Sequence, residues 1–572
     1  MMAGTISKFQ RSRPARGRKT VWRLGLALLA GHALVAWGEA WPARTVRFAL
    51  HVEAGTGPLT AGVPLWGRGW MGPDDADGEG ERAGHRWSGG APVQVYGWTP
   101  VGFQLVPSTD GWATLLLEAP AAESAHGRTF SGAVAVADVE AAGTEVVNGR
   151  LRAAAEGRLD GWTRQGPAGD GEAVAFAADH RVSAQVRPGA GLAQRIPLTA
   201  GRPLTIRFQA RAVPPPAYHA MPARRRATDT PAAAALQSFQ RGVNLGNYLE
   251  APPGEDWGRG YTPSDFDAIR AEGFDHVRIP VAWHHHWASA PGGPVAAAFF
   301  ERVDRLVNLA LERDLAVLLN WHHYDAFMQD PAGHEDHLAQ GWREIAARYA
   351  DVPGTIAFEI LNEPHGRADT FTMNGVYQRL IPLIRSVAPD RTLFAGPGRY
   401  QHIEELRWLR LPPDDNLVVS VHHYEPFLFT HQGAAWARPL TNTTGIVFPG
   451  PPAQPLTPDA EAVQAQRWIA PWVHAYNELP AALNPSSEES LVGLLRWARA
   501  WSDQYAYPLH VGEWGCVAWV DGPSRLRYHR EMRRLLAQWE LPWTLWDWNQ
   551  NFRYWDDAQQ TPVEGLREAL FH

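Results

Sequence analysis

The chain has 572 residues, more than one ordinary domain holds, so two or three domains are expected. Its 45% hydrophobic and 20% charged residues are typical of a globular protein, and its net charge of −7 argues against a nucleic-acid-binding or polybasic membrane surface. The single cysteine, Cys516, excludes a disulfide within the chain and a cysteine-based metal site.

The N-terminal segment has the pattern of an export signal. Residues 1–23 carry seven Lys and Arg residues and no acid, the 14-residue apolar stretch LGLALLAGHALVAW (24–37) follows, and GEAWPA offers a small-residue cleavage site after Ala40. A bilayer span needs about 20 apolar residues, so this stretch is short for one. We predict a signal peptide over residues 1–40 and a secreted or periplasmic protein with no membrane contact after cleavage. An uncleaved anchor is the alternative.

Residues 44–212 are predicted to form an all-β sandwich. Short segments with alternating apolar residues are separated by Gly-, Asp- and Pro-rich turns, at 45–53, 92–98, 112–120, 132–143, 181–188 and 203–212. Two stretches, VNGRLRAAAEGRLDGWTRQG (147–166) and GLAQRIPLTAGRPLTIRFQARA (191–212), resemble the signature of jelly-roll carbohydrate-binding modules, without the usual acidic residue after the opening strand. The resemblance implies sugar binding; the alternative is a domain that only packs against the rest of the chain.

A Pro- and Ala-rich linker is predicted over residues 213–238, followed by a (β/α)8 barrel over 239–572. Eight apolar segments alternate with helical segments such as 296–314 and 523–539, whose apolar residues have helical spacing. This alternation is typical of a closed parallel sheet surrounded by helices. The eight predicted strands are 241–246, 276–283, 315–323, 356–364, 392–397, 417–426, 509–515 and 542–548. An elaborate connection, 427–508, follows the sixth.

Polar and aromatic residues lie at the C-terminal ends of these strands, where a barrel of this type builds its active site. They include Arg278, His322, Asn362, Glu363, His422, Tyr424, Glu513 and Trp546. Buried carboxyl and imidazole groups cost free energy unless they are paired, so a purely structural barrel has no need of them. Two carboxyl groups at strand ends suit glycoside hydrolysis, in which one donates a proton and the other acts ionised. Arg278 is a candidate for keeping one of them ionised.

The segment 240–572 resembles glycoside hydrolase family 5, the cellulase-containing family. The matching stretches are RGVNLGNYLE, GFDHVRIPVAW, VLLNWHHYD, FEILNEPHG, VHHYEPFLFTHQGAAW, VGEWG and PWTLWDWNQNF. The resemblance implies that Glu363 is the general acid/base and Glu513 the nucleophile, held by Arg278 and Tyr424. It further implies that His322, Asn362 and His422 surround the sugar and that Trp546 stacks on it. The chain departs from the family at NFRYWDD (551–557), where Phe-Gly is common.

These observations predict a secreted retaining endo-β-1,4-glucanase that acts on a β-linked polysaccharide as a monomer, without cofactor or metal. A β-mannanase, xyloglucanase or β-1,3-glucanase, and a non-catalytic glycan-binding protein, are the alternatives. Histidines cluster at His284–His286 and in two His-His pairs, a composition that a metal hydrolase could also use. Adjacent strand residues point to opposite faces, which argues against shared ligation.

Overall fold

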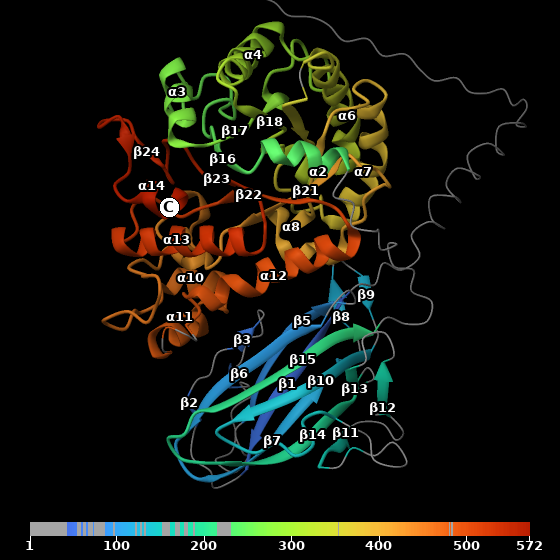
Figure 1. Cartoon of the computed structure of the whole chain (residues 1–572), viewed down its shortest axis with the longest axis vertical. Helices are drawn as coiled ribbons and strands as arrows, with labels where there is room; N and C mark the ends of the chain where they lie inside the picture. The colour runs from blue at the N-terminus through green and yellow to red at the C-terminus, as the bar shows by residue number, and fades with distance from the viewer. Residues whose placement is uncertain are drawn as a thin grey trace, which may run out of the picture. The chain divides into compact units, whose positions relative to one another are not determined.

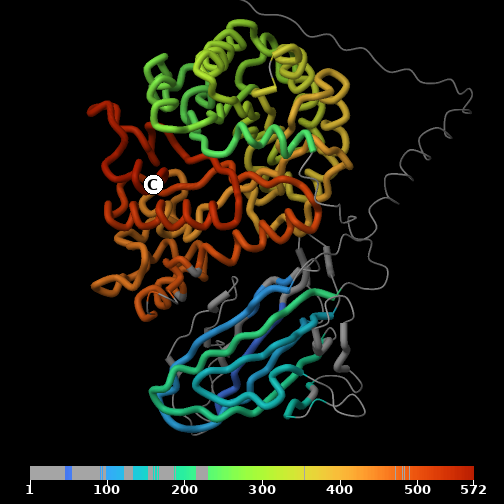
Figure 2. Tube along the Cα trace, in the orientation of Figure 1, coloured from blue at the N-terminus to red at the C-terminus, as the bar shows by residue number. Residues whose placement is uncertain are grey.

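The computed structural model describes residues 43–213, with short gaps, and residues 230–572 apart from 353, 480, 482 and 483. Figure 1 shows the ribbon, and Figure 2 traces the same chain as a tube. The predicted signal peptide, 1–40, lies outside these residues. Among the helices that are described, we find none with the length and apolar character needed to cross a membrane.

The N-terminal region consists of antiparallel sheets, as predicted. One sheet has the strand order β11-β14-β7-β1-β5-β4, and the other β12-β13-β10-β15-β6-β2, with β3 pairing β6. Phe48 of β1 stacks on Phe103 of β6, with ring centroids 5.2 Å apart, so the inner faces of the two sheets meet in an apolar core. The strands of the first sheet are β1 (Ala43–Val52), β4 (Gly72–Pro73), β5 (Arg86–Gln94), β7 (Gly111–Glu118), β11 (Thr163–Gln165) and β14 (Gly191–Leu198). Those of the second are β2 (Leu59–Thr60), β3 (Pro64–Trp66), β6 (Thr99–Pro107), β10 (Ala133–Ala142), β12 (Glu172–Phe176), β13 (Arg181–Val186) and β15 (Leu204–Val213), and β8 (Glu123–Ala125) pairs with β9 (Arg128–Phe130).

The residues that carry the resemblance to carbohydrate-binding modules serve the packing of this region. The Gln194 amide accepts from the Val147 N–H and donates to the Val147 and Gly161 carbonyls, at 2.8–2.9 Å. The buried indole of Trp162 also donates to the Val147 carbonyl, at 3.1 Å. These side chains are therefore occupied within the fold.

The C-terminal region is a closed parallel barrel of eight strands in chain order, as predicted. Its strands are buried on both faces, which explains why they appear in the sequence as continuous apolar runs. They are β16 (Arg241–Asn244), β17 (His276–Ile279), β18 (Ala316–Asn320), β19 (Ile356–Glu359), β20 (Leu393–Ala395), β21 (Leu417–His423), β22 (Leu509–Trp514) and β23 (Trp543–Leu545).

Helices surround the barrel (Figure 1). The predicted helix at 296–314 is α4 (Ala297–Leu311), and that at 523–539 is α13 (Gly522–Gln538). The further α-helices and 3-10 helices (η), which lie around the barrel or in its loops, are α3 (Pro263–Glu272), η3 (Trp283–His285), α5 (Asp325–Gln329), α6 (Pro331–Arg348), α7 (Thr370–Arg385), α8 (Gly398–Gln401), η4 (Ile403–Trp408), α9 (Phe427–Thr430), η5 (Ala435–Ala437), α10 (Ala460–Ala465), α11 (Ile469–Glu478), α12 (Glu488–Tyr505) and α14 (Leu566–Phe571). A small hairpin, β24 (Trp555–Asp556) with β25 (Thr561–Pro562), follows the last barrel strand.

The end of the predicted linker belongs to the barrel. Residues 230–238 form α2 (Pro231–Ala235) and η2 (Leu236–Ser238), which begin at the N-cap Thr230. Ala232, Leu236 and Phe239 form one buried cluster with inward-facing residues of β18, β19, β20 and β21. This cluster fills the barrel interior, and the linker can extend at most over the residues before 230.

Candidate active site

Arg278 is the centre of the hydrogen-bond network at the C-terminal end of the barrel. Its side chain comes from β17, is fully buried, and donates to Glu359 at 2.6 Å, Glu513 at 2.7 Å, Asn244 at 2.8 Å and Asn362 at 2.6 Å. The planar guanidinium group suits such a fixed set of acceptors. One permanent positive charge thereby faces two buried carboxylates.

Glu513, near the end of β22, has two donors aimed at its carboxylate. Arg278 Nη1 donates to Oε1 at 2.7 Å, and the Tyr424 hydroxyl donates to Oε2 at 3.0 Å. Burial raises the pKa of Glu513 above its ordinary value, and the Arg278 charge and the Tyr424 hydroxyl act in the opposite direction. The two donors favour the ionised form of this side chain.

Glu363 lies beyond the end of its strand. We predicted a strand over 356–364, but β19 ends at Glu359, and Glu363 has a left-handed backbone with φ 47°. A non-glycine residue adopts this conformation only where its surroundings hold it. Here the Glu363 N–H donates to the buried Gln401 side chain at 2.9 Å. The loop after β20 therefore fixes the backbone from which the Glu363 side chain projects.

The environment of the Glu363 carboxyl differs from that of Glu513. Its Oε1 lies 2.7 Å from Nδ1 of His422, and burial lowers the pKa of that imidazole to about 4, so His422 is neutral near pH 7. Burial also raises the pKa of Glu363 to about 7, against the charges of Arg278 and His365. A fraction of Glu363 is consequently protonated at neutral pH, as proton donation requires.

The two carboxyl groups are close together. One oxygen of Glu363 and one of Glu513 lie within 4.8 Å of each other, with a ring nitrogen of His422 within the same distance of both. Retaining glycosidases have carboxyl groups about 5–5.5 Å apart, whereas inverting enzymes need about 6.5–9.5 Å to admit a water molecule. The arrangement fits direct attack by one carboxylate.

His322, Asn362 and Trp546 lie together beside this pair. The Trp546 ring is nearly parallel to the His322 ring, at a centroid distance of 5.8 Å and an angle of 9°. Gly246 makes room for the indole, since a Cβ there would lie 2.8 Å from the Trp546 ring. Asn362 contacts His322 through its amide nitrogen, at 3.4 Å. The eight side chains predicted from the strand ends are thus brought to one place.

Five further polar residues belong to this network and were not predicted. Glu359 accepts from Arg278, Gln401 and Ser420, and Asn244 accepts from Arg278. Glu250 is buried beside His322, its Oε1 3.6 Å from Nε2, and burial raises its pKa to about 8. Glu359 and Asn244 could have been found from the sequence, because each is a polar residue within a predicted strand that is otherwise mostly apolar.

A metal ion on His322 does not suit the hydrogen bonding around it. Glu250, His322 and His323 have ligand atoms within 4.8 Å of one another. However, the Asn320 amide nitrogen faces His322 Nδ1 at 3.2 Å, while its oxygen accepts from the Val281 N–H. A metal on Nε2 would require a hydrogen on Nδ1, directed at that amide donor.

Comparisons with known proteins agree with this geometry. Residues 236–552 match the model of the family Cellulase (glycosyl hydrolase family 5). Endoglucanase H of Acetivibrio thermocellus is 25% identical over 312 residues, which are 54% of this chain and 30% of that protein. The chain therefore spans about a third of the length of this relative.

Two solved structures are similar to the barrel region. Endoglucanase Cel5A from Thermotoga maritima has a TM-score of 0.51 and 31% identity, covering 60% of this chain and 100% of that one. The Clostridial cellulose synthase subunit Z from Clostridioides difficile has a TM-score of 0.51 and 26% identity, covering 58% and 100%. With its eight-stranded barrel, its paired carboxyl groups and the family match over more than half of its length, the chain belongs to the cellulase family, glycosyl hydrolase family 5.

Proposed function

We propose that this protein is a secreted, retaining endo-β-1,4-glucanase. The observation that carries the proposal is the pair Glu363 and Glu513, within 4.8 Å of each other and in different hydrogen-bond environments. Such a pair supports double displacement, because one group must be protonated while the other is ionised.

In the first step, the Glu513 carboxylate attacks the anomeric carbon and forms a glycosyl ester. Glu363 gives its proton to the glycosidic oxygen, and the leaving chain departs as an alcohol. In the second step, Glu363 takes a proton from water, which attacks the anomeric carbon and releases Glu513. Two inversions at one carbon give net retention.

The neighbouring residues have matching roles in this proposal. Arg278 and Tyr424 stabilise the ionised nucleophile through their hydrogen bonds. Asn362 and His322 lie where they can bond sugar hydroxyls, and Trp546 offers an apolar ring for stacking. Hydrogen bonds to the 2-hydroxyl strengthen as the sugar becomes oxocarbenium-like.

The substrate class rests on the relatives. The similar proteins named above are endoglucanases and a cellulose synthase subunit. One solved structure of the T. maritima enzyme is a complex with mannotriose and another a complex with cellobiose. We therefore propose β-1,4-glucan as the main substrate, with β-mannan as the second candidate.

The test is hydrolysis of carboxymethyl-cellulose by Glu363→Gln and Glu513→Gln variants. We expect each to lose at least about a thousandfold in kcat. Glu301→Gln, a change to an exposed glutamate on α4, is the matched control and should keep activity. Wild-type activity in both site variants would contradict the site, and a wild type inert on glucan, mannan and xyloglucan would favour a glycan-binding protein.

The domain boundaries complete the proposal: a signal peptide over 1–40, the sandwich over 44–212, a linker from 213, and the barrel region to 572. Sugar binding by the sandwich would retain the enzyme on an insoluble polymer. Binding of the full chain and of a chain lacking 44–212 to insoluble cellulose tests this role. Equal binding by the two chains would leave the sandwich a packing domain.

A further inference from the structure

Two tryptophans of the barrel region expose about half of their surface at the same end as the catalytic pair. Trp436 belongs to η5 in the loop after β21 and is 55% exposed, and Trp519 follows β22 and is 49% exposed. Their rings meet edge to face, with centroids 6.2 Å apart. Single exposed apolar residues need no explanation, but adjoining indoles beside an active site indicate a binding surface.

Trp519 is held in place by specific contacts. Its indole N–H donates to the Gln432 carbonyl at 2.7 Å. Gly433 has φ 75°, and a Cβ there would lie 3.2 Å from the indole nitrogen, so a glycine leaves room for the ring. The backbone on either side is fixed as well, because the Val517 and Ala518 N–H groups donate to carbonyls of the loops after β21 and β23. A ring held this way loses little freedom on binding.

Ring contacts connect these indoles to the nucleophile. Tyr424, whose hydroxyl donates to Glu513, packs on His431 at 4.8 Å and on Phe552 at 5.8 Å. Trp436 contacts the same two rings, at 6.4 Å and 6.2 Å. The aromatic surface therefore begins beside Glu513 and ends at the exposed ring of Trp519.

The position of this surface around the barrel indicates which part of the substrate it meets. In the proposed function, the sugar whose anomeric carbon is attacked stacks on Trp546, which lies at the end of β23. His322, at the end of β18, lies near the same sugar. The leaving chain lies on the side of its proton donor Glu363, which follows β19. Glu363, after β19, and Glu513, on β22, divide the ring of strand ends into two arcs, and Trp546 and His322 belong to the arc from β23 to β18. Trp436 follows β21 on the other arc, and the Trp519 ring, which follows β22, meets it there.

We infer that Trp519 forms an outer sugar subsite, in which its exposed face stacks on a glucosyl unit of the leaving chain beyond the unit next to the cleaved bond. This inference rests on the proposed function and adds to it a preference for long chains. The ligand class is a β-1,4-linked glucan with at least two units on the leaving-group side.

The test compares two substrates in wild type and Trp519→Ala. Cellohexaose reaches an outer subsite, whereas an aryl β-cellobioside has no sugar on the leaving-group side. The ratio of kcat/KM for cellohexaose to that for the aryl cellobioside should fall about two- to tenfold in Trp519→Ala, the loss expected for one aromatic stacking contact. Trp519→Phe, which keeps an aromatic face, should retain most of the ratio.

Trp468→Ala is the matched control, because Trp468 is an exposed indole (38%) in the connection between β21 and β22, at the N-cap of α11. Its ratio should equal that of wild type. An unchanged ratio in Trp519→Ala, or an equal loss on both substrates, would overturn the subsite. The subsite would also be overturned if Trp519→Ala differed from wild type only in its sedimentation, because that result would indicate a surface for a protein partner or a second copy.

A binding measurement separates this inference from the catalytic proposal. Calorimetry of cellohexaose binding to Glu513→Gln does not depend on turnover. Adding Trp519→Ala to this variant should raise the Kd two- to tenfold, the factor expected for the kcat/KM ratio. If wild type hydrolyses neither substrate but the Kd shifts, the subsite stands and the proposed reaction fails. An unshifted Kd overturns the subsite.

Discussion

Replacement of Arg278 by methionine should both destabilise the protein and abolish activity. The guanidinium group is fully buried and donates to Glu359 at 2.6 Å and to Glu513 at 2.7 Å. Methionine leaves both carboxylates without their counter-charge. Removing one partner of a buried ion pair costs about 3–5 kcal/mol, and we expect a loss of that size in the free energy of unfolding.

A second substitution separates the two effects. Adding Glu359→Gln to Arg278→Met removes one of the two uncompensated charges, so part of the lost stability should return. Activity should not return, because Glu513 still lacks the donor that favours its ionised form. The assays are urea unfolding of all four proteins of the cycle and hydrolysis of an aryl cellobioside. If the free energy of unfolding of Arg278→Met lay within about 0.5 kcal/mol of that of wild type, the range typical of a surface change, the reasoning would be refuted.

Three further outcomes follow from the contacts of individual groups. Because Glu363 must be protonated and its pKa is raised to about 7, kcat/KM should fall as the pH rises through about 7; a flat profile from pH 6 to 9 would count against its role as acid. Tyr424→Phe removes a donor to Glu513, so kcat/KM should fall roughly tenfold and the acidic limb of the pH profile should move to higher pH; an unmoved limb would contradict the contact. Burial raises the pKa of Asp265, but hydrogen bonds from Arg259 and its other donors outweigh this and lower it to about 2. Its folded-state pKa is thus depressed, so Asp265→Asn should cost about 2 kcal/mol at pH 7 and less as the pH falls from about 4 towards 2, measured by urea unfolding at pH 7 and pH 3.

The barrel could be predicted from the sequence because its strands and helices have different periodicities. Strands buried on both faces give continuous apolar runs, and α4 and α13 give helical spacing. The tail of the predicted linker, PAAAALQS, has the composition of a flexible Ala-rich segment although it forms α2 and η2. Thr230 followed by Pro231 was the available signal, an N-cap with proline at the first helical position.

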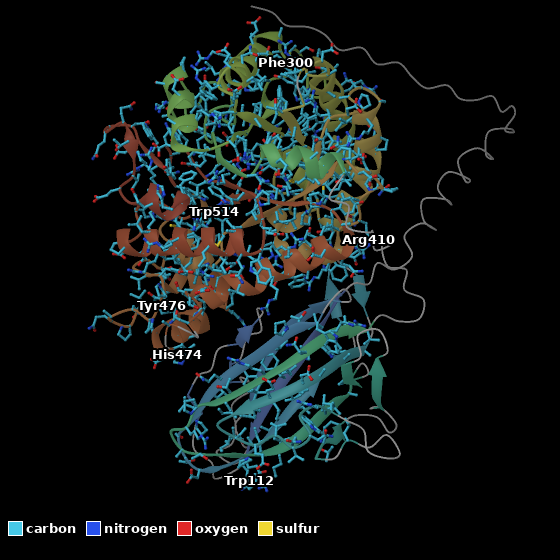
Figure 3. All side chains as sticks on the ribbon, viewed as in Figure 1. Trp112, Phe300, Arg410, His474, Tyr476 and Trp514 are labelled. Atoms are coloured by element: carbon cyan, nitrogen blue, oxygen red, sulfur yellow. The ribbon has the colours of Figure 1, made fainter. Side chains whose placement is uncertain are left out.

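The candidate site could be predicted in part. Residues at strand ends, such as Glu513 and Tyr424, are marked by the abrupt change from apolar to polar sequence. Glu359 and Gln401 lack this mark: the first is followed by two more apolar residues, and the second is the last residue of the short helix α8. Their importance depends on side chains from other strands, which sequence periodicity does not indicate. Trp514, labelled in Figure 3, adjoins Glu513 yet is fully buried, so proximity in sequence does not make a site residue.

The most direct test of the central claim is to trap the glycosyl-enzyme. A 2-deoxy-2-fluoro-β-cellobioside with a good leaving group should form the covalent ester but hydrolyse it slowly, because the fluorine destabilises the oxocarbenium-like transition state of both steps. Peptide mass spectrometry should then find one fluorocellobiosyl group on Glu513. A label on Glu363, or no label together with an inverted product, would contradict the assignment of the two glutamates.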